Sequence, residues 1–313
     1  MPYINGDQPA LTEAQKEFWL EHGYVKIPQC FTREASDAFT HSIWARLGAD
    51  PADKSTWPTE KINMPGHTVV SCKDFAPKAW AAMCELVGGE DKVADFCKDW
   101  KDGFIPNFGK PEYSPDDELD LRTLDNWHND GDWFVHFLDS PEQALLVIPL
   151  FSDIKPKGGG TVLCTDGVGL VARLLHEQTN GCLPNLMPRG TPDLPKDHPD
   201  RRRIWNTWVR DPSLTRDESF CEATGETGDV YLLHPFMLHS ASRNLRREKT
   251  LRELGREGGM PEWKITAARE RLVPDRIRIQ EEMKRKEMEN LKSKGVAVTT
   301  LEGARELSDE YPS

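Results

Sequence analysis

The order of apolar and polar positions near the start of the chain predicts a helix followed by a short strand. Apolar residues recur at helical spacing from Leu11 to His22, where Thr12 can act as N-cap and Gln15, three residues later, completes a capping box. Gly23 ends this helix, and the residues 23–27 have the pattern of a strand. Further amphipathic helices are expected at 32–45, 78–87 and 91–99, with a loop rich in Pro, Asp and Thr at 48–66.

From about residue 103 the apolar residues occur in short runs bounded by turn residues, which is typical of strands. The runs expected to form strands are 104–108, 123–128, 133–138, 144–151, 161–165, 204–209, 229–234 and 236–239. One helix is expected among them, at 169–178. Many short strands separated by turns favour a sandwich or closed barrel over a parallel α/β sheet, so the prediction is a mainly β fold with flanking helices.

The last part of the sequence has a different character. The segment 274–294 is highly charged, begins with proline and has only a weak apolar stripe, which indicates a solvated helix. We therefore expect two regions: a β-rich domain with N-terminal helices at 1–260, and a charged helical extension at 261–313 that packs on the domain or projects from it.

Composition excludes several classes of protein. Of 313 residues, 37% are hydrophobic, which is enough for a core, and the net charge of −12 argues against binding to bulk nucleic acid. No run approaches the roughly 20 apolar residues of a membrane span, and the first residues do not resemble a secretory signal. The seven cysteines show no C-x-x-C spacing, so reduced thiols and a cytoplasmic location are expected.

A histidine and an aspartate two residues apart are the first candidates for chemistry. His128 and Asp130 stand in the segment NWHNDGDWF, and alternate residues of a strand project from the same face, so both side chains can reach one metal ion. One further histidine from a distant strand would complete a two-histidine, one-carboxylate triad, a ligand set that selects non-haem Fe(II). The chain has no Walker A motif, no strand-linked G-x-G-x-x-G and no G-x-S-x-G, so nucleotide-binding and nucleophile-elbow sites have no support.

The third histidine has two candidates in one segment. The sequence GDVYLLHPFMLHSASRN contains His234 and His239 among apolar residues. Periodicity does not choose between them, because Pro235 interrupts the strand register.

Three segments together resemble the phytanoyl-CoA dioxygenase family of Fe(II)- and 2-oxoglutarate-dependent oxygenases. They are LTEAQKEFWLEHGYVKIPQCF, the segment NWHNDGDWF with a later GGGTVL, and GDVYLLHPFMLHSASRN, in the order found in the family. The resemblance implies a double-stranded β-helix, a jelly-roll core of cupin type. It also implies that His239 is the third metal ligand, beside His128 and Asp130.

The same resemblance implies the cofactor and the reaction. Fe(II) would be the metal, 2-oxoglutarate and O2 the co-substrates, and a small organic molecule the substrate, with release of succinate and CO2. Asp130 favours hydroxylation or desaturation, because related halogenases lack this carboxylate. Trp127 and Thr161 are expected to line the co-substrate pocket. The substrate and the oligomeric state are left open by the sequence.

The sequence departs from the family pattern where an arginine should bind the far carboxylate of 2-oxoglutarate. The family carries it on the strand after the distal histidine, whereas residues 245–259 here have the pattern of a charged helix. Arg247 is the first candidate, Arg252 the second, and Arg246 is also nearby. The alternatives are therefore an impaired relative that binds metal or ligand without turnover and, with less support, a metal-dependent hydrolase.

Overall fold

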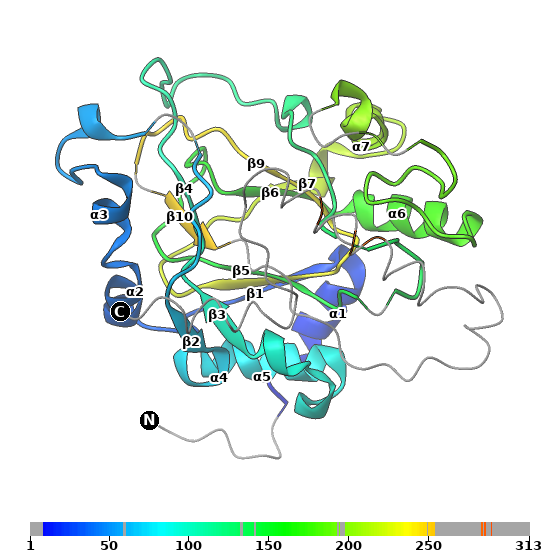
Figure 1. The fold of residues 1–313 in the computed structure, drawn as a ribbon, viewed down its shortest axis with the longest axis horizontal. Helices are drawn as coiled ribbons and strands as arrows, with labels where there is room; N and C mark the ends of the chain where they lie inside the picture. Colours follow the sequence, from blue (N-terminus) through cyan, green and yellow to red (C-terminus); the bar gives the residue numbers. More distant parts are fainter. Residues whose placement is uncertain are drawn as a thin grey trace.

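The computed structural model describes residues 9–253, except 59–60, 132–133, 141, 193, 195–197 and 249, together with Met283, Arg285 and Glu289. It is a mixed protein in which helices surround antiparallel sheets (Figure 1). The α-helices are α1 (Glu13–His22), α2 (Arg33–Thr40), α3 (Ile43–Leu47), α4 (Cys72–Phe75), α5 (Pro77–Val87), α6 (Asp166–Glu177) and α7 (Arg203–Arg210). Short 3-10 turns are η1 (Lys54–Thr56), η2 (Glu90–Lys92), η3 (Asp95–Cys97), η4 (Leu121–Thr123), η5 (Pro199–Arg202) and η6 (Asp217–Ser219).

The strands form two three-stranded sheets and two pairs. They are β1 (Tyr24–Ile27), β2 (Val69–Ser71), β3 (Asp99–Lys101), β4 (Phe104–Asn107), β5 (Leu146–Pro149), β6 (Thr161–Cys164), β7 (Phe220–Glu222), β8 (Val230–Leu233), β9 (Leu238–Ala241) and β10 (Thr250–Glu253). One sheet has the order β1-β8-β5 and the other β7-β6-β9, while β10 pairs with β4 and β2 with β3, all antiparallel. Strand β10 also lies alongside β5, and a single bridge between His128 and His239 continues the second sheet beyond β9.

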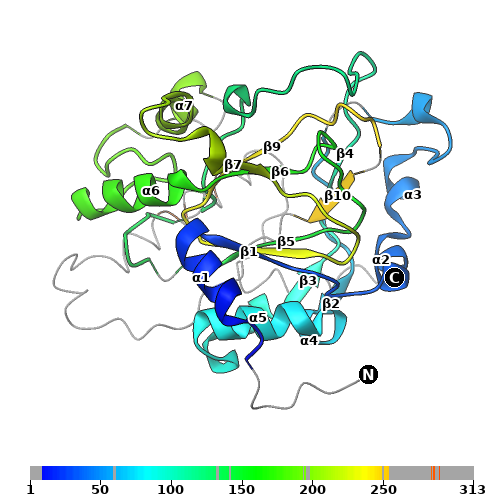
Figure 2. The ribbon, with the colours of Figure 1, turned by 180° about the vertical axis from the view of Figure 1, so that it is seen from behind.

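The two three-stranded sheets lie one above the other and enclose part of the core (Figures 1 and 2). Alternate residues of β5, β8 and β6 meet in one buried cluster, which includes Leu146, Ile148, Leu163, Tyr231 and Leu233. Because alternate residues of a strand point to opposite faces, these residues define the inner face of each sheet.

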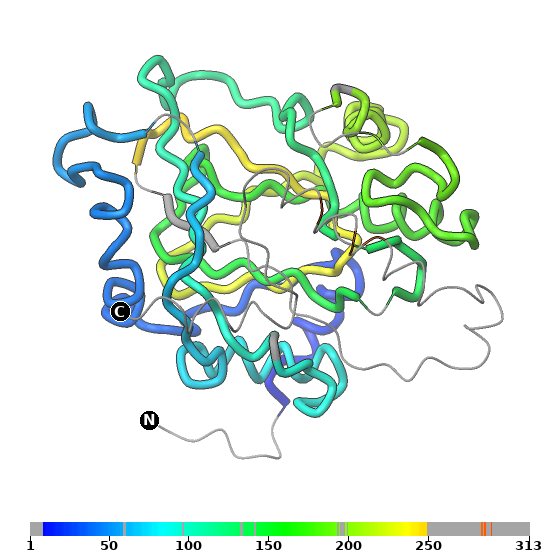
Figure 3. Tube along the Cα trace, in the orientation of Figure 1, coloured from blue at the N-terminus to red at the C-terminus, as the bar shows by residue number. Residues whose placement is uncertain are grey.

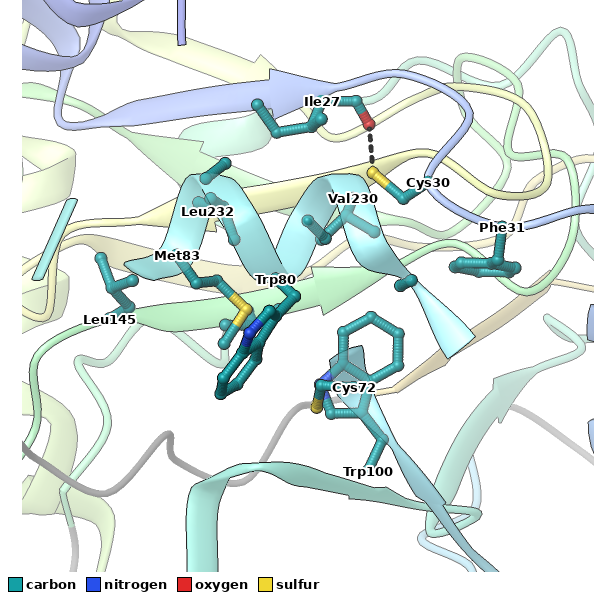
Figure 4. Packing of buried hydrophobic residues seen from close by; sticks show 14 of the residues in the cluster. Ile27, Cys30, Phe31, Cys72, Trp80, Met83, Trp100, Leu145, Val230 and Leu232 are labelled. Atoms are coloured by element: carbon teal, nitrogen blue, oxygen red, sulfur yellow. Dashed lines mark hydrogen bonds between the residues drawn. The ribbon is translucent and has the colours of Figure 1, made fainter. Parts of the chain in front are cut away.

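The outer face of the β1-β8-β5 sheet is covered by helices. Val147 and Leu232 belong to a second cluster together with Trp80 and Met83 of α5. Figure 4 shows the two α5 side chains beside Leu232. Burial of large apolar side chains of this kind contributes about 1.5–3 kcal/mol each, so this contact holds α5 on the sheet.

The outer face of the β7-β6-β9 sheet is covered by α6 and α7. Figure 3 shows the chain leaving β6, forming these helices and returning to β7. Val162 and Leu238 from the sheet pack with Val171 of α6 and with Trp205 and Val209 of α7. This layer lies directly behind the strand segment that carries His128, because Trp127 is part of the same cluster.

Several predictions from the sequence are confirmed. Thr12 caps α1 in a capping box with Gln15, and Gly23 ends the helix in the left-handed conformation at φ 71°. Strands are present within the expected runs 104–108, 144–151, 161–165, 229–234 and 236–239, the last extending to Ala241, and α6 covers most of the expected helix. The expected helix at 32–45 is present as two, α2 and α3.

Three expected elements are wrong. Residues 204–209 are helical, because Trp205 and Val209 are four residues apart and bury one face of α7, whereas their β-branched and aromatic composition had suggested a strand. Residues 91–99 form η2 and η3, and β3 begins at Asp99, where pairing with β2 replaces a helix. The expected charged helix at 245–259 is also wrong in its described part, because residues 250–253 form β10 through their pairing with β4.

Two expected strands are reduced to single bridges. Of 123–128 only His128 is bridged, and of the described part of 133–138 only His136 is bridged, to Cys182. The boundary at 260 and most of the extension 261–313 lie outside the described residues. Met283, Arg285 and Glu289 are helical, and Met283 packs against the buried pair Val135 and Phe137.

Candidate metal centre

His128 and His239 are direct partners across two antiparallel strand segments. The His128 N–H donates to the His239 carbonyl at 3.1 Å, and the His239 N–H donates to the His128 carbonyl at 2.9 Å. Directly opposed residues share a face of the sheet, and the two ring centroids are 4.3 Å apart. His239 is also opposite Leu163 of the inner cluster, so both rings lie on the inner face.

Asp130 brings a carboxylate to the same place. Its Oδ1 is 3.3 Å from His128 Nε2 and 3.6 Å from His239 Nε2, and one ligand atom from each of the three residues lies within 4.8 Å of the others. Ligand atoms at about 2.1 Å from a metal and at right angles to one another are about 3 Å apart. The three side chains therefore fit one metal ion with small adjustments.

Backbone carbonyls orient both imidazoles. His128 Nδ1 lies 2.6 Å from the Asn126 carbonyl, and His239 Nδ1 lies 3.1 Å from the Met237 carbonyl. A carbonyl oxygen can only accept, so each Nδ1 carries a proton, and Nε2 is the ring nitrogen that lies near Asp130. This is the tautomer that a metal ligand requires.

The three candidate ligands differ in their exposure. The His239 side chain is 1% exposed, whereas those of His128 and Asp130 are 20% and 21% exposed. The His239 side of the centre is therefore closed to solvent, whereas His128 and Asp130 are partly accessible to it.

His234 lies elsewhere. Its Nδ1 accepts a hydrogen bond from the Phe236 N–H at 3.1 Å, and its ring packs near Trp19 and Phe236. Burial lowers the pKa of His234 to about 4, so this ring is neutral at pH 7. The structure brings His239, and not His234, to the other two candidate ligands.

The two residues expected to line a co-substrate pocket are on opposite faces. Thr161 is 1% exposed and stands opposite Ala241, two positions from the Leu163–His239 pair, so it shares the inner face with His239. Trp127 is fully buried in the outer cluster and meets Phe220 edge-on, with ring centroids 5.6 Å apart. Trp127 therefore packs between the sheet and α7, and this position does not favour contact with a co-substrate at the metal.

The three candidate arginines have different surroundings. Arg246 Nε donates to the Pro156 carbonyl at 2.8 Å on the exposed side of the protein. Arg247 is in the left-handed conformation at φ 50°, and its buried Nε has no hydrogen-bond acceptor in the described part of the chain. Arg252 is on β10 opposite Ile105, so the strand after the distal histidine does exist and does carry an arginine.

Two residues next to the centre were missed from the sequence. Asn129, between the two ligands of the H-x-D segment, accepts a hydrogen bond from the indole N–H of Trp205 at 2.8 Å. The residue Gly131 follows Asp130 with φ 117°, and a Cβ there would lie 2.5 Å from a ring carbon of His136. The glycine in N-D-G was a visible signal for a backbone constraint, whereas nothing local marked Trp205 as a neighbour.

Comparison with known proteins gives structural neighbours at low identity. No family model matches the chain, and no curated protein matches it. Solved structures that overlap with it include EvdO2 from Micromonospora carbonacea var. aurantiaca complexed with 2-oxoglutarate (13% identity, 77% of this chain and 88% of that chain, TM-score 0.41). Others are the non-heme alpha ketoglutarate dependent carbocyclase SnoK from nogalamycin biosynthesis (15%, 79% and 85%, TM-score 0.39) and HygX from Streptomyces hygroscopicus with nickel and 2-oxoglutarate bound (12%, 78% and 85%, TM-score 0.41).

Among the helices that the structure describes, none has the length and hydropathy needed to cross a membrane.

Proposed function

We propose that this protein is an Fe(II)- and 2-oxoglutarate-dependent dioxygenase that hydroxylates or desaturates a small organic molecule. The observation that carries the proposal is the convergence of His128 Nε2, His239 Nε2 and an Asp130 carboxylate oxygen on the inner face of a sheet. Two imidazoles and one carboxylate with open positions form the ligand set of non-haem Fe(II) oxygenases.

The strand arrangement supports a jelly-roll core of the cupin type. On one side, β10 lies between β4 and β5, which gives the order β4-β10-β5-β8-β1. On the other side, the bridge at His128 gives the order His128-β9-β6-β7. Two antiparallel layers of four or more strands that face each other are the architecture of a double-stranded β-helix. Membership of the phytanoyl-CoA dioxygenase family remains our proposal from the three sequence segments.

The protein's own residues would divide the work as follows. His128, Asp130 and His239 hold the metal through one atom each, and the carbonyls of Asn126 and Met237 keep the imidazoles in the coordinating tautomer. Bound iron would supply oxidative chemistry driven by decarboxylation of 2-oxoglutarate to succinate. His128 is 20% exposed, so 2-oxoglutarate and O2 would approach the metal from its side.

Arg252 is the residue that we now favour for the far carboxylate of 2-oxoglutarate, ahead of Arg247. It stands on β10, the strand that follows β9, and is paired with Ile105 of β4. The planar guanidinium can bind a carboxylate through two parallel hydrogen bonds.

This position of Arg252 weakens the alternative of an impaired relative, because that alternative was motivated by the apparent lack of the strand. The metal-dependent hydrolase remains the weaker alternative, because the ligand set itself points to Fe(II) oxidation. A cytoplasmic location and a small-molecule substrate remain part of the proposal.

The decisive experiment is anaerobic addition of Fe(II) and then 2-oxoglutarate to the apoprotein. A metal-to-ligand charge-transfer band in the visible spectrum is expected, because chelation through the keto and carboxylate oxygens creates it. The His239→Ala variant should lose the band and His234→Ala should keep it. If wild type binds Fe(II) but shows no band at saturating 2-oxoglutarate, the proposed oxygenase function is rejected in favour of an impaired relative that binds metal without turnover.

A further inference from the structure

Helix α7 reaches the metal-binding segment from behind. The indole N–H of Trp205 donates to Asn129 Oδ1 at 2.8 Å, and both residues are 3% exposed. An indole N–H can only donate, so the amide oxygen of Asn129 faces Trp205 and its NH2 group points the other way, where it lies 3.2 Å from the Asp130 carbonyl. The Asn129 side chain therefore connects α7 to the backbone of the next residue, a candidate metal ligand.

A second contact reaches the other side of the first ligand. Arg202, at the end of η5 and directly before α7, has Nη1 3.5 Å from the Trp127 carbonyl. Trp127 and Asn129 flank His128, so one turn of chain touches the residues immediately before and after it. This pattern follows from the strand period: His128 and Asp130 face the centre, while Trp127 and Asn129 face α7.

The H-x-D segment needs these contacts from η5 and α7 because, among the described residues, it forms few backbone hydrogen bonds to the sheet. These are the two hydrogen bonds of the single bridge between His128 and His239. Asp130 lies beyond this bridge, and the glycine after it is in the left-handed region. A segment held by one bridge gains most of its remaining order from the side chains packed against it.

We propose that Trp205 is a positioning residue for the metal centre, and that it acts through Asn129 to fix the spacing of His128 and Asp130. The inference rests on the proposed metal site, and it goes beyond that site by assigning a role to α7, which lies outside the sheets. A buried acceptor that loses its donor rearranges or admits water, and a rearranged Asn129 side chain would also lose its hydrogen bond to the Asp130 carbonyl, which helps to hold the backbone between the two ligands.

The test compares Trp205→Phe with the matched control Trp208→Phe. Both residues are on α7 and pack in the same cluster. In the described part of the chain, the Trp205 side chain forms a hydrogen bond to the metal-binding segment, and the Trp208 side chain forms none. The probe is Co(II) alone, titrated into the apoprotein by calorimetry. We expect Trp205→Phe to weaken Co(II) binding by about tenfold, the lower end of the effect of residues that orient metal ligands, and Trp208→Phe to leave it unchanged.

A second variant separates positioning from packing. Asn129→Leu removes the acceptor, so adding Trp205→Phe to Asn129→Leu should cause no further loss of Co(II) affinity. Additive losses in the double variant would overturn the proposal, because they would mean that Trp205 acts independently of Asn129. Equal Co(II) affinity of Trp205→Phe and wild type would overturn it as well.

Hydrogen exchange in the apoprotein tests the same claim without metal. Amides of residues 126–131 should exchange faster in Trp205→Phe than in Trp208→Phe, at matched melting temperature. Unchanged exchange would overturn the positioning role. If wild type binds no Co(II), the proposed function fails, while the exchange experiment still decides whether Trp205 holds this segment.

Discussion

His128 and His239 form a backbone-bonded pair across the sheet although 111 residues separate them in the sequence, and their rings lie 4.3 Å apart on its inner face. The H-x-D spacing alone is common and supplies two side chains. The pairing of His128 with His239 adds a third side chain at the same place. The sheet register therefore brings His239, and not His234, beside His128 and Asp130.

The first prediction concerns the metal ligands. Replacement of His128, Asp130 or His239 by alanine removes one of three ligand atoms, so Fe(II) affinity should fall by more than the 10–100-fold that is typical for residues that only orient ligands. His234→Ala should change it little, because that ring contacts Trp19 and Phe236 instead. Calorimetric titration of each apoprotein with Fe(II) under anaerobic conditions measures the difference.

Retention of metal by His239→Ala together with its loss in His234→Ala would contradict this assignment. Melting temperatures of the apoproteins serve as the control for folding. His239 is almost completely buried, so a loss of stability in that variant has to be separated from a loss of ligand.

The second prediction concerns the anchor of 2-oxoglutarate. Arg252→Leu should weaken 2-oxoglutarate binding by roughly 150- to 5,000-fold, because removal of one partner of a desolvated charge pair costs about 3–5 kcal/mol. Fe(II) affinity should stay the same, since no metal ligand is changed. Arg246→Leu is the control, because this guanidinium is held by the Pro156 carbonyl on the exposed side.

Titration of the charge-transfer band gives the affinity of each variant. Arg247→Leu belongs in the same series, because the buried Nε of Arg247 makes it the remaining candidate. A loss confined to Arg247→Leu would restore the assignment made from the sequence alone and reject Arg252.

The sequence predicted those parts of the fold that depend on interactions between near neighbours along the chain. The capping box of Thr12 and Gln15 and the left-handed Gly23 need only neighbouring residues, and they are present as expected. The H-x-D spacing likewise needs only the strand period. These features could be read from the sequence because each depends on residues at most four positions apart.

The features that could not be predicted depend on distant partners. The residues of β10 lie in a charged segment that was expected to be helical, yet pairing with β4, more than 140 positions earlier, makes them a strand. Trp205 looked like part of a strand, but its place behind Asn129 follows from the packing of α7 on the sheet. The periodicity of a sequence contains no information about such contacts, so the contact between α7 and Asn129 could be found only in the structure.

The third prediction concerns the cysteines. All seven are free in the structure, and five of them are buried. Burial raises the pKa of Cys30 and Cys182 to about 12 and that of Cys84 to about 11, so thiolate is scarce at pH 8. Iodoacetamide should label the native protein slowly, with the partly exposed Cys84 ahead of the buried thiols, and should label all seven after unfolding without reductant. Mass spectrometry counts the labels, and a native disulfide would contradict the expected reducing compartment.

The last prediction links His234 to the pH dependence of stability. Burial lowers its pKa to about 4 from an ordinary value of 6.5, so between these pH values the unfolded chain binds a proton that the folded chain does not. Stability should therefore decrease as the pH falls from 6.5 to 4, by about 2–3 kcal/mol from this residue, and the loss should be complete below pH 4. In His234→Asn the amide oxygen can still accept the Phe236 N–H but does not titrate, so the variant should lose this part of the slope. Urea unfolding at pH 8 and pH 5 gives the free energies of both proteins, and parallel pH profiles for wild type and variant would show that His234 does not stay neutral in the folded protein.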